Sequence, residues 1–503
     1  MQSIINVGVD GMIVEIECRL SNGLPTIIIV GLGSKAIDEA KERVRGALAS
    51  CHAQMPRKRI AINLAPADIP KETTSLDLPI ALAILQYSGQ IKYKPTKKEA
   101  FIGELGLNGD VKAVRGIIGK ILAGKKQGIQ TFYIPLGNLQ QAFLVPNITI
   151  VPIATMNEIF LGFNDRKKLK AIETREGKQP IRHSTTYEIS LRDIAGQARA
   201  KRALEIAAAG GHNVFLNGPP GTGKSMLAKA LPSIMPALSQ EEMLEITHLH
   251  SLASSNYEEI LTARPFRSPH HSASHVAIVG GGHAVRPGEI TLSHRGVLFF
   301  DELPEFNRTA IEALRQPLED GVITISRAKG TATYPAHFIL VATANPCPCG
   351  YYGTDRICRC PAHSILRYRQ KMSGPIMDRI DLYIDVEQVA HETLLSRGDD
   401  SLEIEIRKRV HAARLIQAKR FASTTKLNAN MSNKDLKDHP FLESDPQSML
   451  NEAAKALELS ARSYMRVIKV ARTIADLSEM KNIHTSHIAE ALQYRPQTVN
   501  ILD

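Results

Sequence analysis

One segment constrains the fold of this chain more than any other: VFLNGPPGTGKSMLAKAL, residues 214–231. Its first three residues are an apolar run that predicts a strand, and a helical pattern begins at Lys224. Between them lies the pattern G-x-x-x-x-G-K-[ST], in the strand–loop–helix context that a phosphate-binding loop requires. Glycines let backbone N–H groups approach phosphate oxygens, and the helix N-terminus adds a favourable dipole. The segment therefore predicts a nucleotide-binding domain of the α/β class.

Two side chains of this loop have expected roles. Lys224 is expected to reach the β- and γ-phosphates, and Ser225 to ligate Mg²⁺. The residues expected to contact the nucleotide here are Gly218, Pro219, Pro220, Gly221, Thr222, Gly223, Lys224, Ser225 and Met226.

Two further segments point to hydrolysis rather than binding alone. GVLFFDELPEF (296–306) contains a buried strand that ends in Asp301-Glu302. We expect Asp301 to hold the Mg²⁺ shell and Glu302 to polarise the attacking water. HFILVATANPC (337–347) predicts a third core strand ending in Asn345, which would orient that water; an ordinary Asn at a strand end is the alternative.

The whole chain divides into four stretches. Residues 1–162 mix strand and helix patterns and predict an α/β domain of their own, with Ser34 capping a helix and Asn108-Gly109 at a hairpin turn. Residues 163–188 predict a basic linker, because apolar periodicity is lost and 165–182 carry seven Lys/Arg against three Asp/Glu.

Residues 189–386 alternate strands and helices, which is typical of an open parallel sheet. Strand patterns fade after that, and 387–503 predict helices.

The net charge of +11 favours a polyanionic partner, nucleic acid above all, although a basic protein without such a partner is the alternative. No apolar run approaches the ~18–20 residues of a membrane span. The N-terminus MQSIINVGVDG has no basic residue before its apolar stretch, so it does not predict a signal peptide. A cytoplasmic protein is expected, where clustered cysteines indicate metal or redox chemistry more often than a disulfide.

Five motifs together resemble the AAA+ ATPases: DIAGQ, GPPGTGKS, LFFDE, TANP and GPIMDRIDL. The similarity is greatest to the branch with magnesium chelatase subunit I, MoxR-type ATPases and MCM helicases. Including its N-terminal region, nearly the whole chain resembles the YifB/ComM family of magnesium-chelatase-like proteins. PFRSPHH (265–271) and GGGHAVRPGEITLSHRGVLFFDE (280–302) are specific to that family. The resemblance implies a P-loop AAA+ αβα core with a parallel sheet and a C-terminal helical lid.

The resemblance also implies roles for residues outside the loop. Gln197 lies where the family approaches the adenine of ATP, and Arg379 matches an arginine that reaches the ATP of a neighbouring subunit. Arg462 matches a second sensor, an arginine of the lid that touches the γ-phosphate, with Arg466 as the alternative. An arginine acting in trans requires a homo-oligomer, and the usual assembly of the family is a hexameric ring.

Segment 247–295 holds seven of the 17 histidines. The resemblance implies that an insertion here forms loops facing a central pore. Arg264, Arg267 and Arg286 are candidates to grip nucleic acid. A histidine metal site is the alternative, but no H-x₃-H pair recurs with a carboxylate partner.

Residues 66–85 and 101–120 resemble the proteolytic domain of Lon, which uses a Ser–Lys dyad. Ser75 occupies the serine position, but Ile118 occupies the lysine position. Lys120 is two residues away, about 200° round a helix, and is expected to face elsewhere. We therefore expect a Lon-like α/β fold without protease activity; activity with a displaced lysine is the alternative.

Four of the six cysteines lie in CPCGYYGTDRICRC, with the spacing C-x-C-x₈-C-x-C. Four thiolates suit a structural Zn²⁺ site, and reduced thiols or a disulfide are the alternatives. The candidate ligands are Cys347, Cys349, Cys358 and Cys360. Residues 356–379 carry six Lys/Arg against one Asp, with tyrosines nearby, which suits single-stranded nucleic acid or a solvated basic face.

These patterns lead to one hypothesis with two alternatives. The leading hypothesis is an oligomeric ATP-driven motor on single-stranded or branched DNA, and the resemblance suggests helicase-like branch migration in recombination or natural transformation. The first alternative is a remodeller of a protein partner, as in MoxR or the chelatase subunit. The second is a Lon-like ATP-dependent protease, which Ile118 disfavours. Chelatase activity itself is not expected, because the N-terminal region is not part of that subunit.

Overall fold

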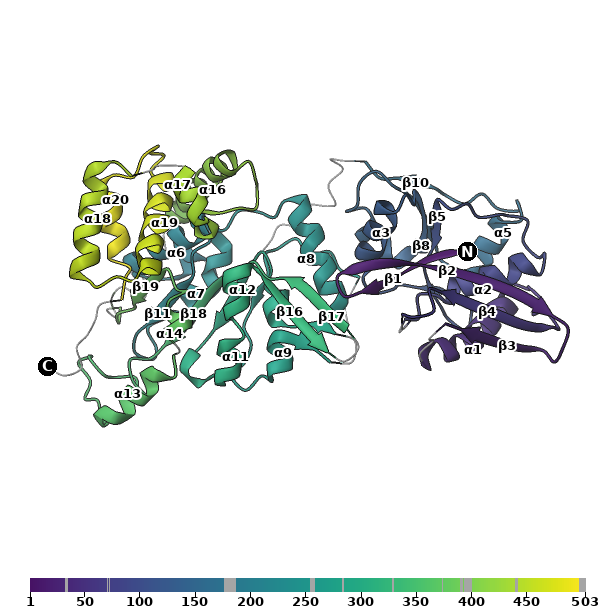
Figure 1. Cartoon of the computed structure of the whole chain (residues 1–503), viewed down its shortest axis with the longest axis horizontal. Coiled ribbons are helices and arrows are strands. Elements are labelled where there is room, and N and C mark those ends of the chain that lie inside the picture. The colour runs from purple at the N-terminus through teal and green to yellow at the C-terminus, as the bar shows by residue number, and fades with distance from the viewer. Residues whose placement is uncertain are drawn as a thin grey trace.

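Three consecutive parts follow one another along the computed structural model: an N-terminal part (1–175), a central part (187–389) and a C-terminal part (400–496) (Figure 1). The predicted helix cap Ser34 lies outside the described residues. The residues that the structure describes are 1–31, 35–69, 71, 73–175, 187–253, 258–282, 285–327, 330–372, 374–389, 392, 400–438 and 442–496.

The N-terminal part contains two four-stranded sheets, with strand orders β1-β2-β4-β3 and β10-β9-β8-β5. A short antiparallel pair, β6 and β7, encloses Asn108-Gly109, so the predicted hairpin is confirmed. Strand β10 pairs with β9 inside the segment predicted as a linker. The strands are β1 (Gln2–Val7), β2 (Asp10–Ser21), β3 (Thr26–Val30), β4 (Arg59–Ala65), β5 (Glu99–Phe101), β6 (Glu104–Leu105), β7 (Val111–Lys112), β8 (Thr131–Pro135), β9 (Thr149–Ile153) and β10 (Ile172–Glu173).

Helices cover these sheets. Helix α2 is apolar on nearly all sides, and residues 77–85 are all buried. The carboxylate of Asp77 is compensated by Arg43 of α1, 2.6 Å away. The helices are α1 (Lys35–Ser50), α2 (Asp77–Tyr87), α3 (Ile117–Lys126), η1 (Leu136–Asn138), α4 (Leu139–Ala142) and α5 (Met156–Gly162).

The central part is built on five parallel strands in the order β12-β15-β18-β11-β19. Alternate residues of each strand face opposite layers: Val297 and Phe299 join one core cluster, while Leu298 and Phe300 join another. The predicted parallel sheet is confirmed. The strands are β11 (Val214–Asn217), β12 (Phe266–Arg267), β15 (Val297–Phe300), β18 (Ile339–Ala344) and β19 (Leu382–Asp385).

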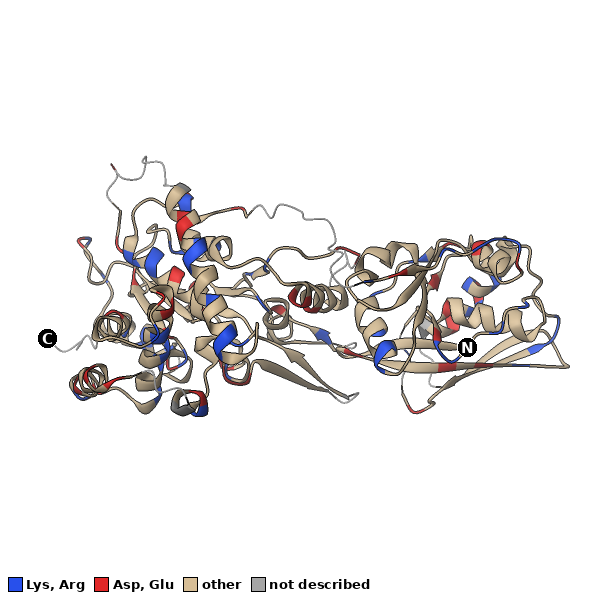
Figure 2. Cartoon of the chain, turned by 90° about the horizontal axis from the view of Figure 1, so that it is seen from above, with Lys and Arg blue, Asp and Glu red and all other residues tan. Residues whose placement is uncertain are grey.

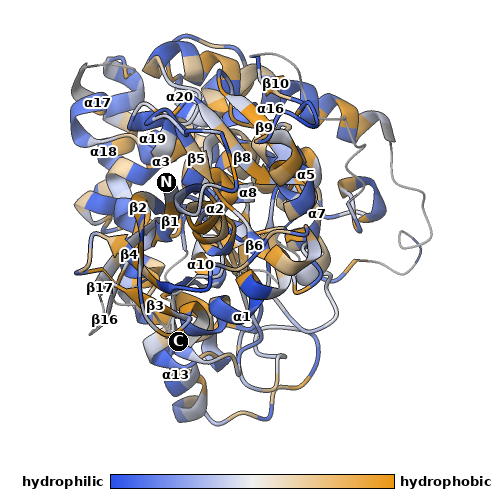
Figure 3. Cartoon of the chain, turned by 90° about the vertical axis from the view of Figure 1, so that its right-hand side faces the viewer, coloured by the Kyte–Doolittle hydropathy of each residue, from blue (hydrophilic) through white to orange (hydrophobic). Residues whose placement is uncertain are grey.

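Helices and two hairpins surround this sheet. Figure 3, which looks onto the N-terminal part, shows hydrophobic and hydrophilic residues mixed along the helices of the chain, as expected of amphipathic elements. The hairpins are β13 (Gly280–Gly281) with β14 (Arg286–Pro287), and β16 (Val322–Arg327) with β17 (Gly330–Pro335). The helices are η2 (Leu191–Asp193), α6 (Ala198–Gly210), α7 (Lys224–Ile234), α8 (Gln240–Ala253), α9 (His275–Val279), α10 (Glu289–Leu292), η3 (Leu303–Glu305), α11 (Arg308–Glu312), α12 (Arg315–Asp320), α13 (Ala362–Gln370) and α14 (Gly374–Met377).

The C-terminal part is helical, as the sequence predicted. Its helix α19 packs on α6, and His212 bonds to Thr473 across that contact at 2.8 Å. Among the described residues, no helix combines the length and apolar character needed to cross a membrane. The helices are α16 (Asp400–Phe421), η4 (Asn428–Asn430), α17 (Asn433–Asp438), α18 (Ser444–Ala456), α19 (Ala461–Leu477) and α20 (Thr485–Leu492).

Candidate nucleotide site

The loop predicted to hold phosphate lies at the carboxyl edge of the central sheet. It follows β11 and opens α7, beside the carboxyl ends of β15 and β18. In open parallel sheets ligands bind at this edge, where polar residues at several strand ends converge. The loop, Asp301 and Asn345 therefore share one edge because the parallel strands all point the same way.

The loop backbone is open towards solvent. Gly221 and Gly223 have φ values of 81° and 86°, and nothing lies within 4 Å of a Cβ built on either residue. A Cβ on Gly218 would lie 2.3 Å from the carbonyl oxygen of Val386, so glycine is required there. Thr222 donates a hydrogen bond to the carbonyl of Pro219 at 3.0 Å. This arrangement fits a phosphate group approached by backbone N–H groups.

Lys224 points back over the loop. Its Nζ donates to the carbonyl oxygens of Gly218 at 2.6 Å and Pro219 at 2.8 Å, and to Asn345 Oδ1 at 3.1 Å. Burial lowers the pKa of Lys224, and the carboxylates of Asp301 and Glu302 oppose that shift. The structure thus brings the predicted phosphate-binding lysine and the predicted water-orienting asparagine into direct contact.

Asp301 is held by two hydroxyl groups. Ser225 donates to its Oδ2 at 3.0 Å, and Thr343 donates to its Oδ1 at 2.7 Å. Glu302 has a φ of 54°, a left-handed conformation that is rare outside glycine, and its N–H donates to Thr343 Oγ1 at 2.9 Å. A serine and an aspartate at this distance form a suitable pair of oxygen ligands for Mg²⁺.

Sequence reasoning missed Thr343. It is fully buried in β18 and connects the neighbouring residues Asp301 and Glu302 to the central strand. The signal was present as a lone hydroxyl in the otherwise apolar strand ILVATA. A buried hydroxyl requires a partner, and the strand order supplies it from β15.

Gln197 lies near the same edge. Its Nε2 donates to the carbonyl of Glu387 at 2.7 Å, one residue after Val386, which packs on the loop. Met226, in the first turn of α7, is 41% exposed. Both positions suit the expected contacts, that of Gln197 with the adenine and that of Met226 with the nucleotide.

The predicted arginines lie at the other edge of the sheet. Arg379 precedes β19, and its carbonyl accepts from Asn213, which precedes β11. Arg379 and Arg462 both pair with Glu319 of α12, the second at 3.8 Å. Arg466 pairs with Asp381. The structure therefore does not bring Arg379, Arg462 or Arg466 to the loop of their own chain.

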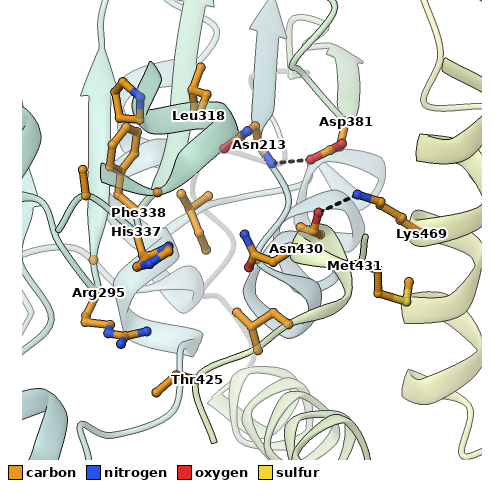
Figure 4. Close-up of a pocket in the computed structure, with 18 of the residues that line it drawn as sticks. Asn213, Arg295, Leu318, His337, Phe338, Asp381, Thr425, Asn430, Met431 and Lys469 are labelled. Atoms are coloured by element: carbon orange, nitrogen blue, oxygen red, sulfur yellow. Dashed lines mark hydrogen bonds between the residues drawn. The ribbon is translucent and has the colours of Figure 1, made fainter. Parts of the chain in front are cut away.

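A cavity of about 490 Å³ opens beside these arginines. Figure 4 shows Asn213 and Asp381 joined by a hydrogen bond of 3.0 Å at its upper side, with Lys469 bonded to the chain beside Asn430. Arg466 and Glu319 also line it. Its position at the amino edge separates it from the phosphate loop.

One candidate for gripping nucleic acid is excluded. Arg264 is 7% exposed, pairs with Glu242 at 3.1 Å and donates to the carbonyl of Arg295 at 2.8 Å. The expectation for Arg264 is therefore wrong, because this guanidinium is part of the core of the central part. Arg267 pairs with Glu289 at 2.5 Å, whereas Arg286 is exposed.

The four clustered cysteines converge. Their four sulfur atoms all lie within 4.8 Å of one another, and three of the pairs are 3.4, 3.7 and 3.6 Å apart. Four thiolates around a zinc ion at about 2.3 Å would lie ~3.8 Å apart, so the cluster has the size of a tetrahedral site. Among the described residues, no other group of three or more His, Cys, Asp or Glu side chains converges in this way.

Residues 347–360, which carry the four cysteines, are called the cysteine loop, and residues 218–225 the phosphate loop. The two loops are in contact. A Cβ built on Gly350 would lie 2.5 Å from Cδ of Pro220. On the outer side, Arg356 lies over the ring of Tyr351 and Arg369 over that of Tyr352, at 5.3 and 5.4 Å. Elsewhere blue and red segments are interspersed over the whole molecule (Figure 2), so the positive charge is not confined to one part.

In the N-terminal part, Ile118 is fully buried in an apolar cluster, and Ser75 is 1% exposed and bonded to Thr73 at 2.9 Å. We expected Lys120 to face away from the segment that carries Ser75, and this expectation is wrong. Lys120 lines the same cavity as Thr73 and Thr74, because α3 presents its fourth residue towards the segment that precedes α2.

Three family models of magnesium chelatase match the chain. Residues 190–394 match magnesium chelatase, subunit ChlI, and residues 401–495 match its C-terminal region. Residues 16–138 match a model described as subunit ChlI of Mg-chelatase. This last match contradicts the argument that the N-terminal region is foreign to the chelatase subunit.

Relatives extend over nearly the full length. Competence protein ComM of Haemophilus influenzae is 42% identical over 497 residues, which cover 97% of this chain and 96% of that protein. YifB of Escherichia coli is 40% identical over 494 residues, covering 97% and 95%. A magnesium-chelatase 67 kDa subunit of Chlorobaculum parvum is 27% identical over 164 residues, 31% of this chain and 23% of that protein.

Proposed function

This chain belongs to the YifB/ComM family of magnesium-chelatase-like proteins, and on that premise we propose that it is an ATP-hydrolysing AAA+ motor that acts on DNA. One observation carries the hydrolytic part: Ser225, Asp301 and Thr343 are hydrogen-bonded in series beside Lys224 and Glu302. In this assignment Lys224 binds the β- and γ-phosphates, Ser225 and Asp301 hold Mg²⁺, and Glu302 with Asn345 directs the attacking water.

Three observations support DNA as the substrate. The chain has a net charge of +11. Arg356 lies over Tyr351 of the cysteine loop and Arg369 of α13 lies over Tyr352, an arrangement that suits unpaired bases and phosphates. A relative covering nearly the whole chain is named a competence protein. We assign the motor to helicase-like branch migration in recombination or natural transformation, acting as a hexameric ring.

The test is the rate of ATP hydrolysis by the purified chain with and without single-stranded DNA and a synthetic Holliday junction. Stimulation should fall steeply as salt rises, because phosphate contacts release counterions. The Lys224→Ala protein is the control for contaminating ATPases. Unstimulated hydrolysis together with no junction migration would refute the DNA motor and favour a remodeller of a protein partner.

We assign a structural Zn²⁺ to Cys347, Cys349, Cys358 and Cys360. Four thiolates leave no open position for water, so this metal would stabilise the loop rather than take part in chemistry. Metal analysis of freshly purified, reduced protein should give one zinc per chain, lost in a Cys358→Ser/Cys360→Ser variant. Absence of stoichiometric zinc would remove the assignment.

We assign the N-terminal part a Lon-like fold without protease activity. Ile118 occupies the lysine position and is fully buried in an apolar cluster, so the side chain there offers no base to Ser75. Casein should remain intact with ATP and DNA present. Cleavage that is lost in a Ser75→Ala variant would overturn this assignment.

A further inference from the structure

A second cavity, of about 450 Å³, lies where the N-terminal and central parts meet. We call it the junction cavity. One wall comes from β1, from Thr73 and Thr74 and from the start of α3. The other comes from α8, β14 and β17 of the central part, and Figure 1 shows α8 and β17 on the side of that part that faces the N-terminal part. None of its described lining residues belongs to the phosphate loop.

The walls are packed firmly against each other. A Cβ on Gly119 of α3 would lie 2.4 Å from the ring of His248 of α8, and His248 Nε2 donates to the carbonyl of Val9 at 2.8 Å. A Cβ on Gly8 would lie 3.1 Å from the Cβ of Ala332 in β17. The cavity is thus a defined space and not a gap between loosely placed parts.

Lys120 lines this cavity with a charge that nothing compensates. It is 2% exposed, and no hydrogen bond or ion pair to its ammonium group occurs within the part of the chain that the structure describes. Burial lowers the pKa of Lys120 to about 7. Asn6, which also lines the cavity, has a buried Oδ1 without a partner, while its Nδ2 donates to the carbonyl of Arg115 at 3.2 Å.

The other charges of the cavity are mostly positive. Arg115 and Arg286 line it from opposite walls, against one carboxylate, that of Glu104, which accepts a hydrogen bond from Thr74. Helix α3 begins beside it at Gly116, and no side chain caps the N-terminus of that helix. Guanidinium and ammonium groups and the N–H groups at the start of a helix donate hydrogen bonds to phosphate oxygens.

We propose that the junction cavity binds a small molecule through a phosphate group, which contacts Lys120. The volume falls in the usual range for small-molecule sites, roughly 300–1,000 Å³, and exceeds what a single inorganic phosphate fills. The ligand is therefore a phosphorylated compound of nucleotide size. It would contact both parts of the chain at once.

The experiment is calorimetric titration of the full chain with inorganic pyrophosphate. Because the phosphate loop also accepts this probe, four proteins are compared: the wild type, Lys224→Ala, Lys120→Met and the double variant. We expect the wild type to bind pyrophosphate at two sites per chain and each single variant to bind it at one site. The double variant should not bind it. Lys126→Met, at the exposed end of α3, is the matched control and should bind like the wild type.

The titration tests the junction site and the assignment of the phosphate loop independently of each other. Two sites in Lys120→Met would overturn the junction site, whereas two sites in Lys224→Ala would overturn only the assignment of the phosphate loop. Asn6→Asp provides a second variant that places a carboxylate in the cavity, and it should weaken the junction site at least tenfold. A final titration uses succinate, a dicarboxylate without phosphorus. If succinate bound at the junction cavity and pyrophosphate did not, the ligand would not be a phosphate compound.

Discussion

The two acidic neighbours at the end of β15 are in different surroundings. Asp301 accepts hydrogen bonds from Ser225 and Thr343, so its carboxylate is already oriented for a metal shell. The carboxylate of Glu302 has no hydrogen-bond partner within the described residues, and its backbone is held in a left-handed conformation by Thr343. These surroundings agree with the proposed roles, Asp301 as a ligand of Mg²⁺ and Glu302 as the residue that polarises water.

Replacing Glu302 by Gln should separate binding from hydrolysis. The amide keeps the shape of the side chain but does not accept a proton from water, so kcat should fall by about 10²–10⁴-fold while ATP affinity stays near that of the wild type. Steady-state hydrolysis and equilibrium binding of a fluorescent ATP analogue measure the two effects. Glu305→Gln, on the adjacent turn, is the control, and normal turnover in Glu302→Gln would refute the assigned role.

Replacing Lys120 by Met should stabilise the chain. The pKa of Lys120 falls from 10.5 to about 7 on folding, so the folded state binds this proton less well than the unfolded state. The cost to folding grows by about 1.4 kcal/mol per pH unit as the pH falls from 10.5 to 7, and is constant below. Methionine removes that cost.

Thermal unfolding at pH 7, 8 and 9 tests this reasoning. Lys120→Met should unfold at a higher temperature than the wild type at pH 7, and the difference should shrink at each step towards pH 9. Lys126→Met should differ little at any of these pH values. A lower unfolding temperature for Lys120→Met at pH 7 would mean that the ammonium group has a compensating partner.

At the scale of elements, the cysteine loop contacts the phosphate loop where Gly350 lies against Pro220. Gly350 has a φ of 87° and would bring a Cβ to 2.5 Å from Pro220, whereas Gly353, with a φ of 72°, has nothing within 4 Å. Alanine at either position carries the same backbone strain of about 1–2 kcal/mol. Only Gly350→Ala also displaces the phosphate loop.

We therefore expect Gly350→Ala to raise the KM for ATP several-fold and Gly353→Ala to leave it unchanged. Gly350→Ala should lose at least as much thermal stability as Gly353→Ala, because the clash adds to the shared backbone strain. A change of KM in Gly350→Ala alone therefore separates displacement of the phosphate loop from strain. The measurement is ATP hydrolysis as a function of ATP concentration. Equal KM values in the two variants would show that the cysteine loop does not support the nucleotide site.

The elements of the site were predictable because their patterns are local. Each pattern can be recognised within about ten residues. The patterns are a glycine-rich loop between a strand and a helix, and apolar runs that end in Asp301 or Asn345. The contacts of Thr343, Arg264 and Lys120 depend on which strand or helix lies opposite, and a single sequence does not contain that information. Arg264 lies in the histidine-rich segment 247–295, yet its guanidinium pairs with Glu242 of α8.

At the scale of the whole molecule, the phosphate loop and Arg379 lie at opposite edges of the central sheet. The phosphate loop lies at the carboxyl edge of the central sheet, and Arg379 lies at the amino edge beside Asn213. A strand of four residues spans about 13 Å, so these groups do not meet within one chain. If Arg379 contacts the γ-phosphate, the ATP belongs to a neighbouring chain, and in a ring every subunit gives one arginine and receives one.

This geometry predicts complementation between two inactive variants. Lys224→Ala loses its own ATP site but keeps Arg379, and Arg379→Ala has the opposite defect. Mixed at equal amounts before assembly, they should regain about a quarter of the wild-type rate, since half of the subunits keep Lys224 and half of their neighbours keep Arg379. Mixing Lys224→Ala with the double variant should restore nothing, because no intact pair of groups then exists. A mixture of the two single variants that stays inactive, although it assembles, would refute an arginine supplied by the neighbouring chain.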